Sequence, residues 1–324
     1  MVPLLEITNL FVSYKIYEGK LKVLDGVNFS VGNGEKVGLV GEAGCGKTTT
    51  MKTILGLLPQ SGRVDGGEIF FNGKDLLKAT PREIQNLRGK GISMIFQDPT
   101  AALDPVFTVG DQLMAVIRYG SREKMNTKEV KEKALDALRE VKMPDPKRIL
   151  SNYPIQLSGG MRQRVCIAMA LATEPELLIA DEPTTSLDVT IQDQILKLLH
   201  ALVEKRGTSV IFITHSLGVV REMADKVNVM YAGSIIESGK TREIFSNPLH
   251  PYTIDLMKAI PRLSGGGLEE RVPGRIPDYL NPPIGCRFQP RCLRAKFKCS
   301  VEKPELVEIK PDHFLACFFS EGSD

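Results

Sequence analysis

The sequence predicts an α/β fold built around a phosphate-binding loop, with an antiparallel β subdomain, an inserted helical subdomain and a small metal-stabilised C-terminal extension. Three observations lead to this prediction. Short apolar runs suited to strands alternate with helical patterns over most of the chain. A glycine-rich loop that ends in lysine and threonine comes directly after one such run. Four of the six cysteines lie between Cys286 and Cys317.

Composition limits the possible functions only broadly. The chain has 324 residues, of which 42% are apolar and 25% are charged, as in ordinary globular proteins of about two domains. Its net charge is only +3 and no long block of like charge occurs, so electrostatics do not indicate a nucleic-acid partner. We recognise no signal peptide and no apolar run near the roughly 20 residues that span a bilayer. We therefore expect the chain to remain in the cytoplasm.

Residues 41–48 match the phosphate-binding pattern G-x-x-x-x-G-K-[ST] at every position. The apolar run 37–40 predicts a buried strand before the loop, and residues 49–58 predict a helix after it. Glycines in such a loop let backbone N–H groups turn toward phosphate oxygens at the positive end of a helix. Lys47 is then expected to reach the β- and γ-phosphates, and Thr48 to hold Mg²⁺. The candidate ATP-binding residues are Gly41, Glu42, Gly44, Cys45, Gly46, Lys47, Thr48 and Thr49.

The N-terminal segment alternates apolar and polar residues over 4–36 and predicts antiparallel strands that are interrupted near Gly19. Tyr14 and Tyr17 lie near this connection. An aromatic ring there can stack on adenine through its π-face. For either tyrosine taken singly, a purely structural role explains the residue equally well.

Two more strands follow the phosphate-binding loop. Residues 66–73 predict a strand closed by an Asn-Gly turn, and residues 92–96 predict an apolar strand that ends at Gln97. Polar residues at strand ends are where ligand sites of α/β proteins gather. A solvated turn residue is the competing explanation for a lone glutamine.

Residues 98–175 predict the inserted helical subdomain. Residues 108–119 and 126–141 have helical periodicity, and the second segment begins with a pattern that resembles a capping box. Glycines at 157–161 then precede a helix over 162–173. Free N–H groups at the start of that helix predict a second anion site, with an ordinary loop and helix cap as the alternative.

The buried strand 177–180 delivers two carboxylates, Asp181 and Glu182, at its C-terminal end. Asp181 is suited to the Mg²⁺ shell, and Glu182 can orient and polarise a water that attacks the γ-phosphate. A helix over 189–205 and a buried strand over 209–214 follow, and the strand ends on His215. A hairpin of strands 227–231 and 235–237 closes the body of the domain.

Together these motifs resemble the ATP-binding subunits of ABC transporters. They occur in the family's order: Walker A at 41–48, Gln97 of the Q-loop, the signature at 157–161, Walker B with Asp181 and Glu182, the D-loop at 186–188 and His215 of the H-loop. The resemblance covers residues 4–240, and the signature is its most specific part. Residues 157–164, 186–190, 250–253 and the cysteine-bearing tail further resemble the ATPases of oligopeptide and dipeptide importers.

The resemblance implies roles for particular residues. Tyr14 would stack on adenine, with Tyr17 as the alternative, and Thr48, Gln97 and Asp181 would complete the magnesium site. Glu182 would be the catalytic base, and His215 would brace the γ-phosphate. The residues expected against ATP bound by the opposite subunit are Ser158, Gly159, Gly160 and Asp188.

The cysteine cluster of the tail comprises Cys286, Cys292, Cys299 and Cys317. Four thiolates can complete a tetrahedral zinc site or a [4Fe–4S] cluster. The gaps are wider than the close pairs of structural zinc sites, which favours the iron–sulfur cluster, as does the resemblance. A metal-free structural role is the alternative. His313 is an alternative ligand, but we expect it to be a surface side chain.

The resemblance also implies organisation and partners. We expect an ABC ATPase domain over residues 1–246 and an extension over 247–324 whose cluster shapes a surface for a partner. The partners would be a second ABC ATPase subunit, two membrane permease subunits and an extracytoplasmic solute-binding protein, at the cytoplasmic face of a prokaryotic cell membrane. Import of di- or oligopeptides is expected. The alternatives are oligosaccharide import, a soluble ABC ATPase that acts on nucleic acid, and a module that binds ATP without hydrolysing it.

Overall fold

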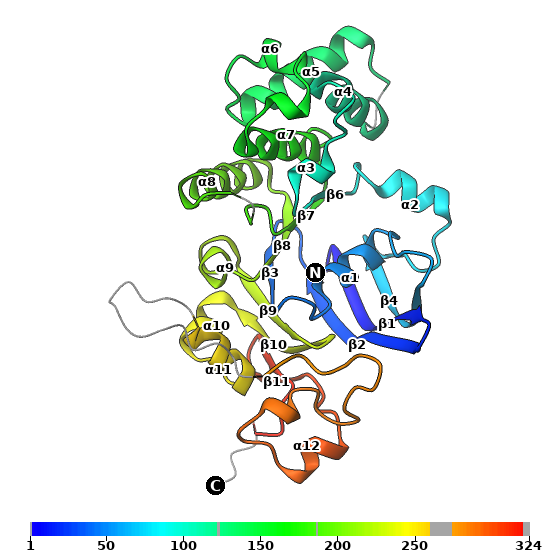
Figure 1. The fold of residues 1–324 in the computed structure, drawn as a ribbon, viewed down its shortest axis with the longest axis vertical. Helices are drawn as coiled ribbons and strands as arrows, with labels where there is room; N and C mark the ends of the chain where they lie inside the picture. Colours follow the sequence, from blue (N-terminus) through cyan, green and yellow to red (C-terminus); the bar gives the residue numbers. More distant parts are fainter. Residues whose placement is uncertain (1, 122–123, 186, 260–273, 320–324) are drawn as a thin grey trace. The chain divides into compact units, whose positions relative to one another are not determined.

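The computed structural model describes residues 2–121, 124–185, 187–259 and 274–319. Two compact units make up the chain: unit 1 comprises Met1–Lys78 and Ile213–Asp324, and unit 2 comprises Ala79–Phe212. The boundary between them falls inside one strand, β8 (Ser209–Thr214). Figure 1 shows the elements in sequence colours, with unit 2 running from cyan to green.

The antiparallel sheet of unit 1 has the strand order β2-β1-β4-β5. Strand β1 pairs antiparallel with both β2 and β4, which confirms the expected hairpin interrupted near Gly19. The Asn72-Gly73 turn between β4 and β5 has positive φ at both residues, 49° and 74°, as a tight hairpin turn requires. The strands are β1 (Leu5–Ile16), β2 (Gly19–Val31), β4 (Gly62–Phe71) and β5 (Lys74–Asp75).

A second sheet of unit 1 contains strands in the order β11-β12-β10-β9-β3. Strand β3 pairs parallel with β9, and the other pairs are antiparallel. The tail therefore continues the sheet that carries the phosphate-binding loop, which the sequence did not predict. The strands are β3 (Lys36–Val40), β9 (Lys226–Tyr231), β10 (Ser234–Lys240), β11 (Val307–Lys310) and β12 (His313–Leu315).

Unit 1 also contains short helices and a core to which the tail contributes. Tyr231 lies 4.8 Å from Tyr252 and 5.1 Å from Phe288, measured between ring centroids. All three side chains are buried in one cluster with Val40 of β3, so body and tail share a core. The helices are α1 (Lys47–Ile54), α9 (Leu217–Met223), α10 (Thr241–Ser246), α11 (Pro251–Lys258), the 3-10 turn Gln289–Arg291 and α12 (Phe297–Val301).

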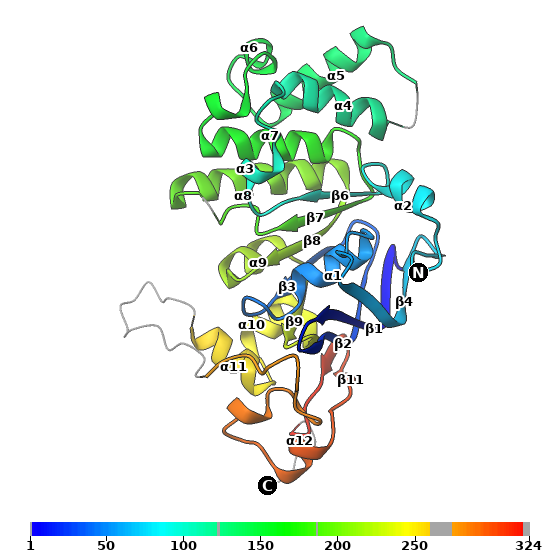
Figure 2. The same cartoon turned by 45° about the vertical axis from the view of Figure 1, so that its right-hand side comes forward.

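Unit 2 combines parallel strands with a group of helices. Strand β6 (Ile92–Ile95) pairs parallel with β7 (Leu177–Asp181), and every residue of β7 is buried. Helix α7 packs against α3, α4, α5 and α8, as the two views in Figures 1 and 2 also show. The helices are α2 (Pro81–Leu87), α3 (Pro99–Ala102), α4 (Val109–Gly120), α5 (Thr127–Glu140), α6 (Pro146–Leu150), the 3-10 turn Pro154–Gln156, α7 (Gly159–Leu171) and α8 (Val189–Arg206).

The helices expected in the inserted segment are confirmed as α4 and α5. The capping-box pattern at the start of α5 is present: Asn126 accepts a hydrogen bond from the Glu129 N–H, and the Glu129 carboxylate accepts one from the Asn126 N–H. Within the described part of the chain, no helix is both long enough and apolar enough to cross a membrane.

Candidate nucleotide-binding and catalytic site

The phosphate-binding loop leads from β3 into α1, as predicted. Gly41 has φ 155°, and a Cβ at this position would lie 2.1 Å from the carbonyl oxygen of Met230 on β9, so only glycine fits. Gly44 has φ 81°, a conformation that favours glycine, although a Cβ there would meet no atom within 4 Å. Helix α1 begins at Lys47, so its first N–H groups point at the loop.

Lys47 bonds back onto its own loop. Its Nζ donates to the Gly41 carbonyl at 2.6 Å and to the Glu42 carbonyl at 2.9 Å, and the residue is only 6% exposed. The ammonium is thus held inside the loop that would receive the phosphates. Cys45 is fully buried in the same loop, and this burial raises the pKa of its thiol. The Cys45 side chain is therefore a packing group, and its contribution to binding would be its backbone.

Tyr14 and Tyr17 differ in their surroundings. The Tyr14 hydroxyl lies 3.3 Å from Oγ1 of Thr49 in helix α1, which places this ring beside the phosphate-binding loop. Tyr17 lies in the β1–β2 turn and is fully exposed. The structure therefore places Tyr14, and not Tyr17, in contact with the loop's helix.

In unit 2, polar residues lie at the C-terminal ends of the parallel strands β6 and β7. Gln97 follows β6, and its Nε2 donates to Oε2 of Glu182 at 3.0 Å. The Thr185 hydroxyl donates to the same oxygen at 2.9 Å. Asp181, the last residue of β7, is 5% exposed. Glu182 has φ 45°, in the left-handed region that non-glycine residues seldom adopt. The structure thus brings Gln97 and Glu182 into direct contact.

The signature residues form the start of α7. Ser158 is its N-cap, with Oγ accepting a hydrogen bond from the Met161 N–H at 3.3 Å, and Gly159 and Gly160 lie in the first turn. A Cβ at Gly160 would lie 2.8 Å from Cγ2 of Ile191, so α7 and α8 begin close together.

Asp188 and His215 lie at other element ends. Asp188 caps α8, where its Oδ1 accepts a hydrogen bond from the Ile191 N–H at 3.0 Å. His215 follows β8, on the unit 1 side of the boundary, and is exposed. Ser186, the first residue of the expected D-loop, lies outside the described residues.

Known proteins that are similar to this chain belong to one family. A family model described as ABC transporter matches residues 24–185, and one described as the C-terminal region of oligopeptide/dipeptide transporters matches residues 236–299. The chain is 48% identical over 320 residues to a probable peptide ABC transporter ATP-binding protein of Sinorhizobium fredii, across 98% of this chain and 95% of the relative. The chain belongs to the ABC transporter family of ATP-binding proteins.

Other relatives are similar over their whole lengths. The dipeptide transport ATP-binding protein DppD of Bacillus subtilis is 46% identical over 324 residues, across 99% of this chain and 96% of the relative. The oligopeptide transport ATP-binding protein OppD of Escherichia coli is 46% identical over 316 residues, across 97% of this chain and 93% of the relative.

Solved structures confirm the α/β fold of an ABC ATPase. An ATP-binding cassette solved as a dimer in a post-hydrolysis state with ADP and Pi has a TM-score of 0.66 and 29% identity, across 74% of this chain and 99% of its own. The cbiO1 chain of Clostridium perfringens, part of an ABC transporter complex, has a TM-score of 0.64 and 28% identity, across 76% of this chain and 92% of its own. The chain is an ATP-hydrolysing subunit of an ABC transporter.

The tail of this ABC ATPase brings its four cysteines to one cavity. Cys286, Cys292, Cys299 and Cys317 line it together with apolar side chains and His250. Yet among the described residues, no group of three or more His, Cys, Asp or Glu side chains is arranged to hold a metal ion. The four thiols therefore line one cavity, but in the described residues they are not arranged as metal ligands.

Burial controls the ionisation of groups around this cavity. Burial, together with smaller contributions from the other three cysteines, raises the pKa of the Cys286 thiol to about 11. Burial also lowers the pKa of His250 to about 3. This imidazole is therefore neutral near pH 7, and its Nδ1 accepts a hydrogen bond from the Tyr252 N–H at 3.0 Å.

The expectation that His313 is a surface side chain is wrong. His313 is 1% exposed, and its Nε2 lies 2.9 Å from Oε1 of Glu237, which is itself fully buried. The Glu237 carboxylate also accepts hydrogen bonds from the N–H groups of Leu249 and His250, both at 2.9 Å. A partner 76 residues away in sequence keeps this imidazole inside, because its Nε2 pairs with the buried Glu237 carboxylate.

Sequence reasoning missed the contacts that the tail makes with the phosphate-binding loop. Arg291 donates two hydrogen bonds to the Glu42 carboxylate, both at 2.9 Å, and Tyr279 donates to the Gly44 carbonyl at 2.8 Å. The Glu42 N–H donates to the Tyr252 hydroxyl at 3.0 Å. No sequence pattern signals pairs separated by more than 200 residues, so only the folded chain identifies them.

Proposed function

We propose that this ABC ATPase hydrolyses ATP to drive import of di- or oligopeptides through a membrane permease. The observation that carries the proposal is the extent of the likeness. The relatives named for peptide, dipeptide and oligopeptide transport match over nearly the whole chain, and the tail matches the C-terminal region of that class of transporter. An oligosaccharide importer is the alternative from the same subfamily, and a soluble ABC ATPase acting on nucleic acid is a more distant one.

We propose that the loop residues of unit 1 bind the nucleotide. Lys47 and the loop N–H groups would hold the phosphates, because the ammonium already lies inside the loop and can exchange carbonyl partners for phosphate oxygens. Tyr14 would stack on adenine, which its contact with Thr49 supports. His215 would brace the γ-phosphate.

We propose that Glu182 is the general base for the attacking water. The hydrogen bonds from Gln97 and Thr185 to one of its oxygens hold the carboxylate in a defined orientation. Thr48, Gln97 and Asp181 would hold Mg²⁺, which supplies charge neutralisation for the phosphates when it is bound.

We propose that two such subunits act together. Ser158, Gly159, Gly160 and Asp188 would face ATP held by a second ABC ATPase subunit. Ser158 and the two glycines form the start of α7, and the positive end of a helix attracts an anion. The assembly would include two permease subunits and an extracytoplasmic solute-binding protein, with this chain at the cytoplasmic face of the membrane. Residues 1–246 would be the ATPase domain and 247–324 the extension.

Peptide uptake by cells tests the transported substrate. Deletion of the gene should abolish uptake of labelled di- or oligopeptides, and the intact gene, but not Lys47→Ala, should restore it. Labelled oligosaccharide uptake is the matched control and should not change. Loss of oligosaccharide uptake with peptide uptake intact would replace the proposed substrate class by the alternative.

We also propose that Cys286, Cys292, Cys299 and Cys317 hold a [4Fe–4S] cluster, with zinc as the alternative. Their common cavity supports this proposal, since a metal could draw the four thiols together as the fold of the tail forms. The test is the visible absorption of anaerobically purified protein, with iron, sulfide and zinc measured on the same sample. Brown protein with iron and sulfide supports the cluster, colourless protein with one zinc supports the alternative, and a sample with neither metal contradicts both.

A further inference from the structure

We propose that the C-terminal extension positions the phosphate-binding loop, and that Arg291 is the positioning residue, acting through Glu42. The proposal rests on the nucleotide-binding role given above to the loop. It assigns the extension a task at the nucleotide site of its own chain, beyond any surface that it offers to partners.

The pair formed by Arg291 and Glu42 is the central contact. Each guanidinium nitrogen, Nη1 and Nη2, lies 2.9 Å from a different carboxylate oxygen of Glu42, the second residue of the loop. The Arg291 side chain is only 5% exposed, and its Cζ lies 5.5 Å from the centroid of the Tyr231 ring. A bidentate pair shielded by aromatic rings fixes both partners in position and in angle.

Burial by itself would lower the pKa of Arg291. Its hydrogen bonds with Glu42 and Tyr231 outweigh burial and raise this pKa, so the guanidinium stays charged. The carboxylate of Glu42 therefore always faces a cation.

Two tyrosines of the tail hold the loop's backbone on either side of Ala43. The Glu42 N–H donates to the Tyr252 hydroxyl, and the Tyr279 hydroxyl donates to the Gly44 carbonyl. A phosphate-binding loop binds its ligand through backbone N–H groups that point toward the phosphates. The two hydrogen bonds to the tyrosines restrict the backbone conformations of the loop and therefore the directions of these N–H groups.

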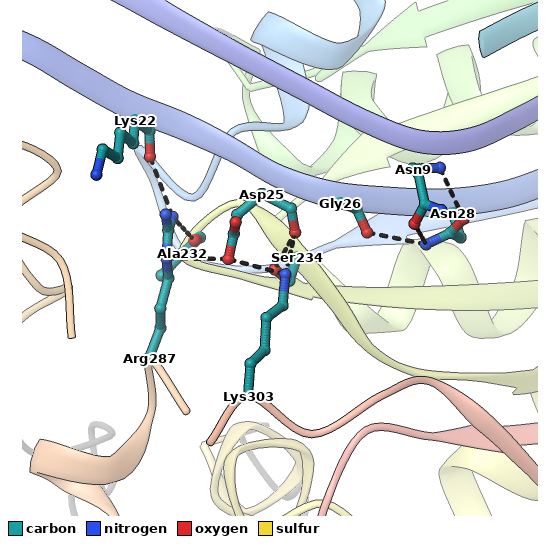
Figure 3. A network of polar contacts seen from close by, with 9 residues as sticks. All are labelled: Asn9, Lys22, Asp25, Gly26, Asn28, Ala232, Ser234, Arg287 and Lys303. Atoms are coloured by element: carbon teal, nitrogen blue, oxygen red, sulfur yellow. Dashed lines mark hydrogen bonds and ion pairs between the residues drawn. The ribbon is translucent and has the colours of Figure 1, made fainter. Parts of the chain in front are cut away.

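A second arginine of the tail, Arg287, contacts β2 and the β9–β10 turn, as Figure 3 shows. Arg287 Nη1 donates to the carbonyl groups of Lys22 at 3.1 Å and Ala232 at 2.6 Å. The next residue, Gly233, donates its N–H to the Cys45 carbonyl of the loop at 2.8 Å. A Cβ at Gly233 would lie 1.9 Å from the Val23 carbonyl oxygen, so this turn is closely packed against β2.

Further contacts in the same view tie the tail to β2. Lys303 Nζ lies 2.8 Å from Oδ2 of Asp25, and it also donates to the Asp25 carbonyl at 2.6 Å. Ser234 donates to the same carbonyl at 2.7 Å. The support of the loop is therefore continuous from the tail through β2 and the β9–β10 turn.

Both arginines are neighbours of cysteines that line the tail cavity. Arg287 directly follows Cys286, and Arg291 directly precedes Cys292. The short segment 286–292 therefore carries both arginines and two of the cysteines that line the cavity. A change in the conformation of this segment would also affect the contacts that the arginines make.

Loss of Arg291 would leave the Glu42 carboxylate without its cation, in the loop that must accept a triphosphate. The unpaired carboxylate would repel the nucleotide, and the loop would sample more conformations. We expect the affinity of the full-length chain for ATP to fall about tenfold in Arg291→Ala. Arg291→Lys keeps the charge but cannot make the bidentate contact, so its loss should be smaller.

The test is calorimetric titration of the full-length chain with Mg²⁺ and a non-hydrolysable ATP analogue. The variants are Arg291→Ala, Arg291→Lys, Glu42→Gln and the double variant Arg291→Ala/Glu42→Gln, with Arg294→Ala, an exposed arginine of the same segment, as the matched control. If Arg291 acts through Glu42, the double variant binds more tightly than Arg291→Ala alone, because the repelling carboxylate is gone. Arg294→Ala should bind as the wild type does.

Two outcomes overturn the proposal. One is an Arg291→Ala chain that binds the analogue as the wild type does. The other is a double variant whose loss of binding free energy equals the sum of the losses in the two single variants. If Arg291→Ala fails to fold, judged by thermal melting, Arg291→Lys and Glu42→Gln decide the question: wild-type affinity in both overturns the proposal. A wild-type chain that binds no better than Lys47→Ala would instead contradict the proposed nucleotide role of the loop.

Discussion

The Glu182 carboxylate shows how single residues set the chemistry of unit 2. Gln97 comes from the end of β6 and Thr185 from the turn after β7, and both donate to Oε2 of Glu182. The backbone of Glu182 adopts φ 45°, a conformation that costs about 1 kcal/mol or more outside glycine and that the surrounding fold must therefore impose. The orientation of the Glu182 carboxylate thus depends on its own backbone and on Gln97 and Thr185.

Substitution of Glu182 by Gln keeps the shape of the side chain and removes the proposed base. We expect ATP turnover in the assembled transporter to fall by at least about 100-fold, while ATP binding is retained. Steady-state phosphate release and nucleotide titration of the same sample measure the two quantities. Glu174→Gln, an exposed site, is the control, and unchanged turnover in Glu182→Gln would remove Glu182 from its assigned role.

Variants of Gln97 test whether its hydrogen bond orients the Glu182 carboxylate. Gln97→Ala removes one donor to Glu182 and should lower kcat about tenfold. Gln97→Glu places a second carboxylate where the amide now lies, 3.0 Å from Oε2, so repulsion should reduce kcat further. Single-turnover hydrolysis separates the two variants. Wild-type rates in both variants would show that the contact does not orient the base.

At the scale of elements, the starts of α7 and α8 constrain each other. Ser158 caps α7 and Asp188 caps α8, and the Cα of Gly160 faces Ile191 in the first turn of α8. The glycine is required by close approach, since a Cβ would lie 2.8 Å from Cγ2 of Ile191. The two helix starts that are proposed to face the nucleotide of a second subunit are therefore held side by side by packing.

Gly160→Ala should lower the free energy of unfolding by about 1–3 kcal/mol, because the added methyl group overpacks this contact. Ile191→Ala in the same chain should recover part of that loss by making room. Urea unfolding followed by circular dichroism measures the difference. No recovery in the double variant would mean that the cost arises elsewhere.

At the scale of the molecule, unit 1 is built from both ends of the chain. Strand β12 pairs with β10, and Tyr252 and Phe288 pack on Tyr231 in one core. The extension is therefore part of the folded unit that carries the phosphate-binding loop, which makes its removal a structural change as well as a functional one.

A chain that ends at Ser246, the last residue of α10, should be strongly destabilised. It would lack the buried rings of Tyr252 and Phe288, and loss of one large buried side chain costs about 3–5 kcal/mol. Soluble yield and thermal melting measure this effect, with a chain that ends at residue 319 as the control. A stable shortened chain with full ATP affinity would show that residues 1–246 fold and bind independently.

Elements and motifs that contiguous residues specify can be predicted from the sequence. The loop at residues 41–48, the carboxylates after β7 and the capped helix α5 each depend on spacing within a few residues, so periodicity and motif reading found them. The predicted roles of these residues stay predictions until the variants above are measured.

Contacts between side chains that are far apart in the sequence depend on the folded chain and could not be predicted. The fold buried His313 against Glu237, chose Tyr14 over Tyr17 as the neighbour of α1, and joined Arg291 to Glu42 across 249 residues of sequence. The physical reason is that burial and pairing depend on partners brought together by the whole fold, whereas propensities and motifs act through neighbours in the chain.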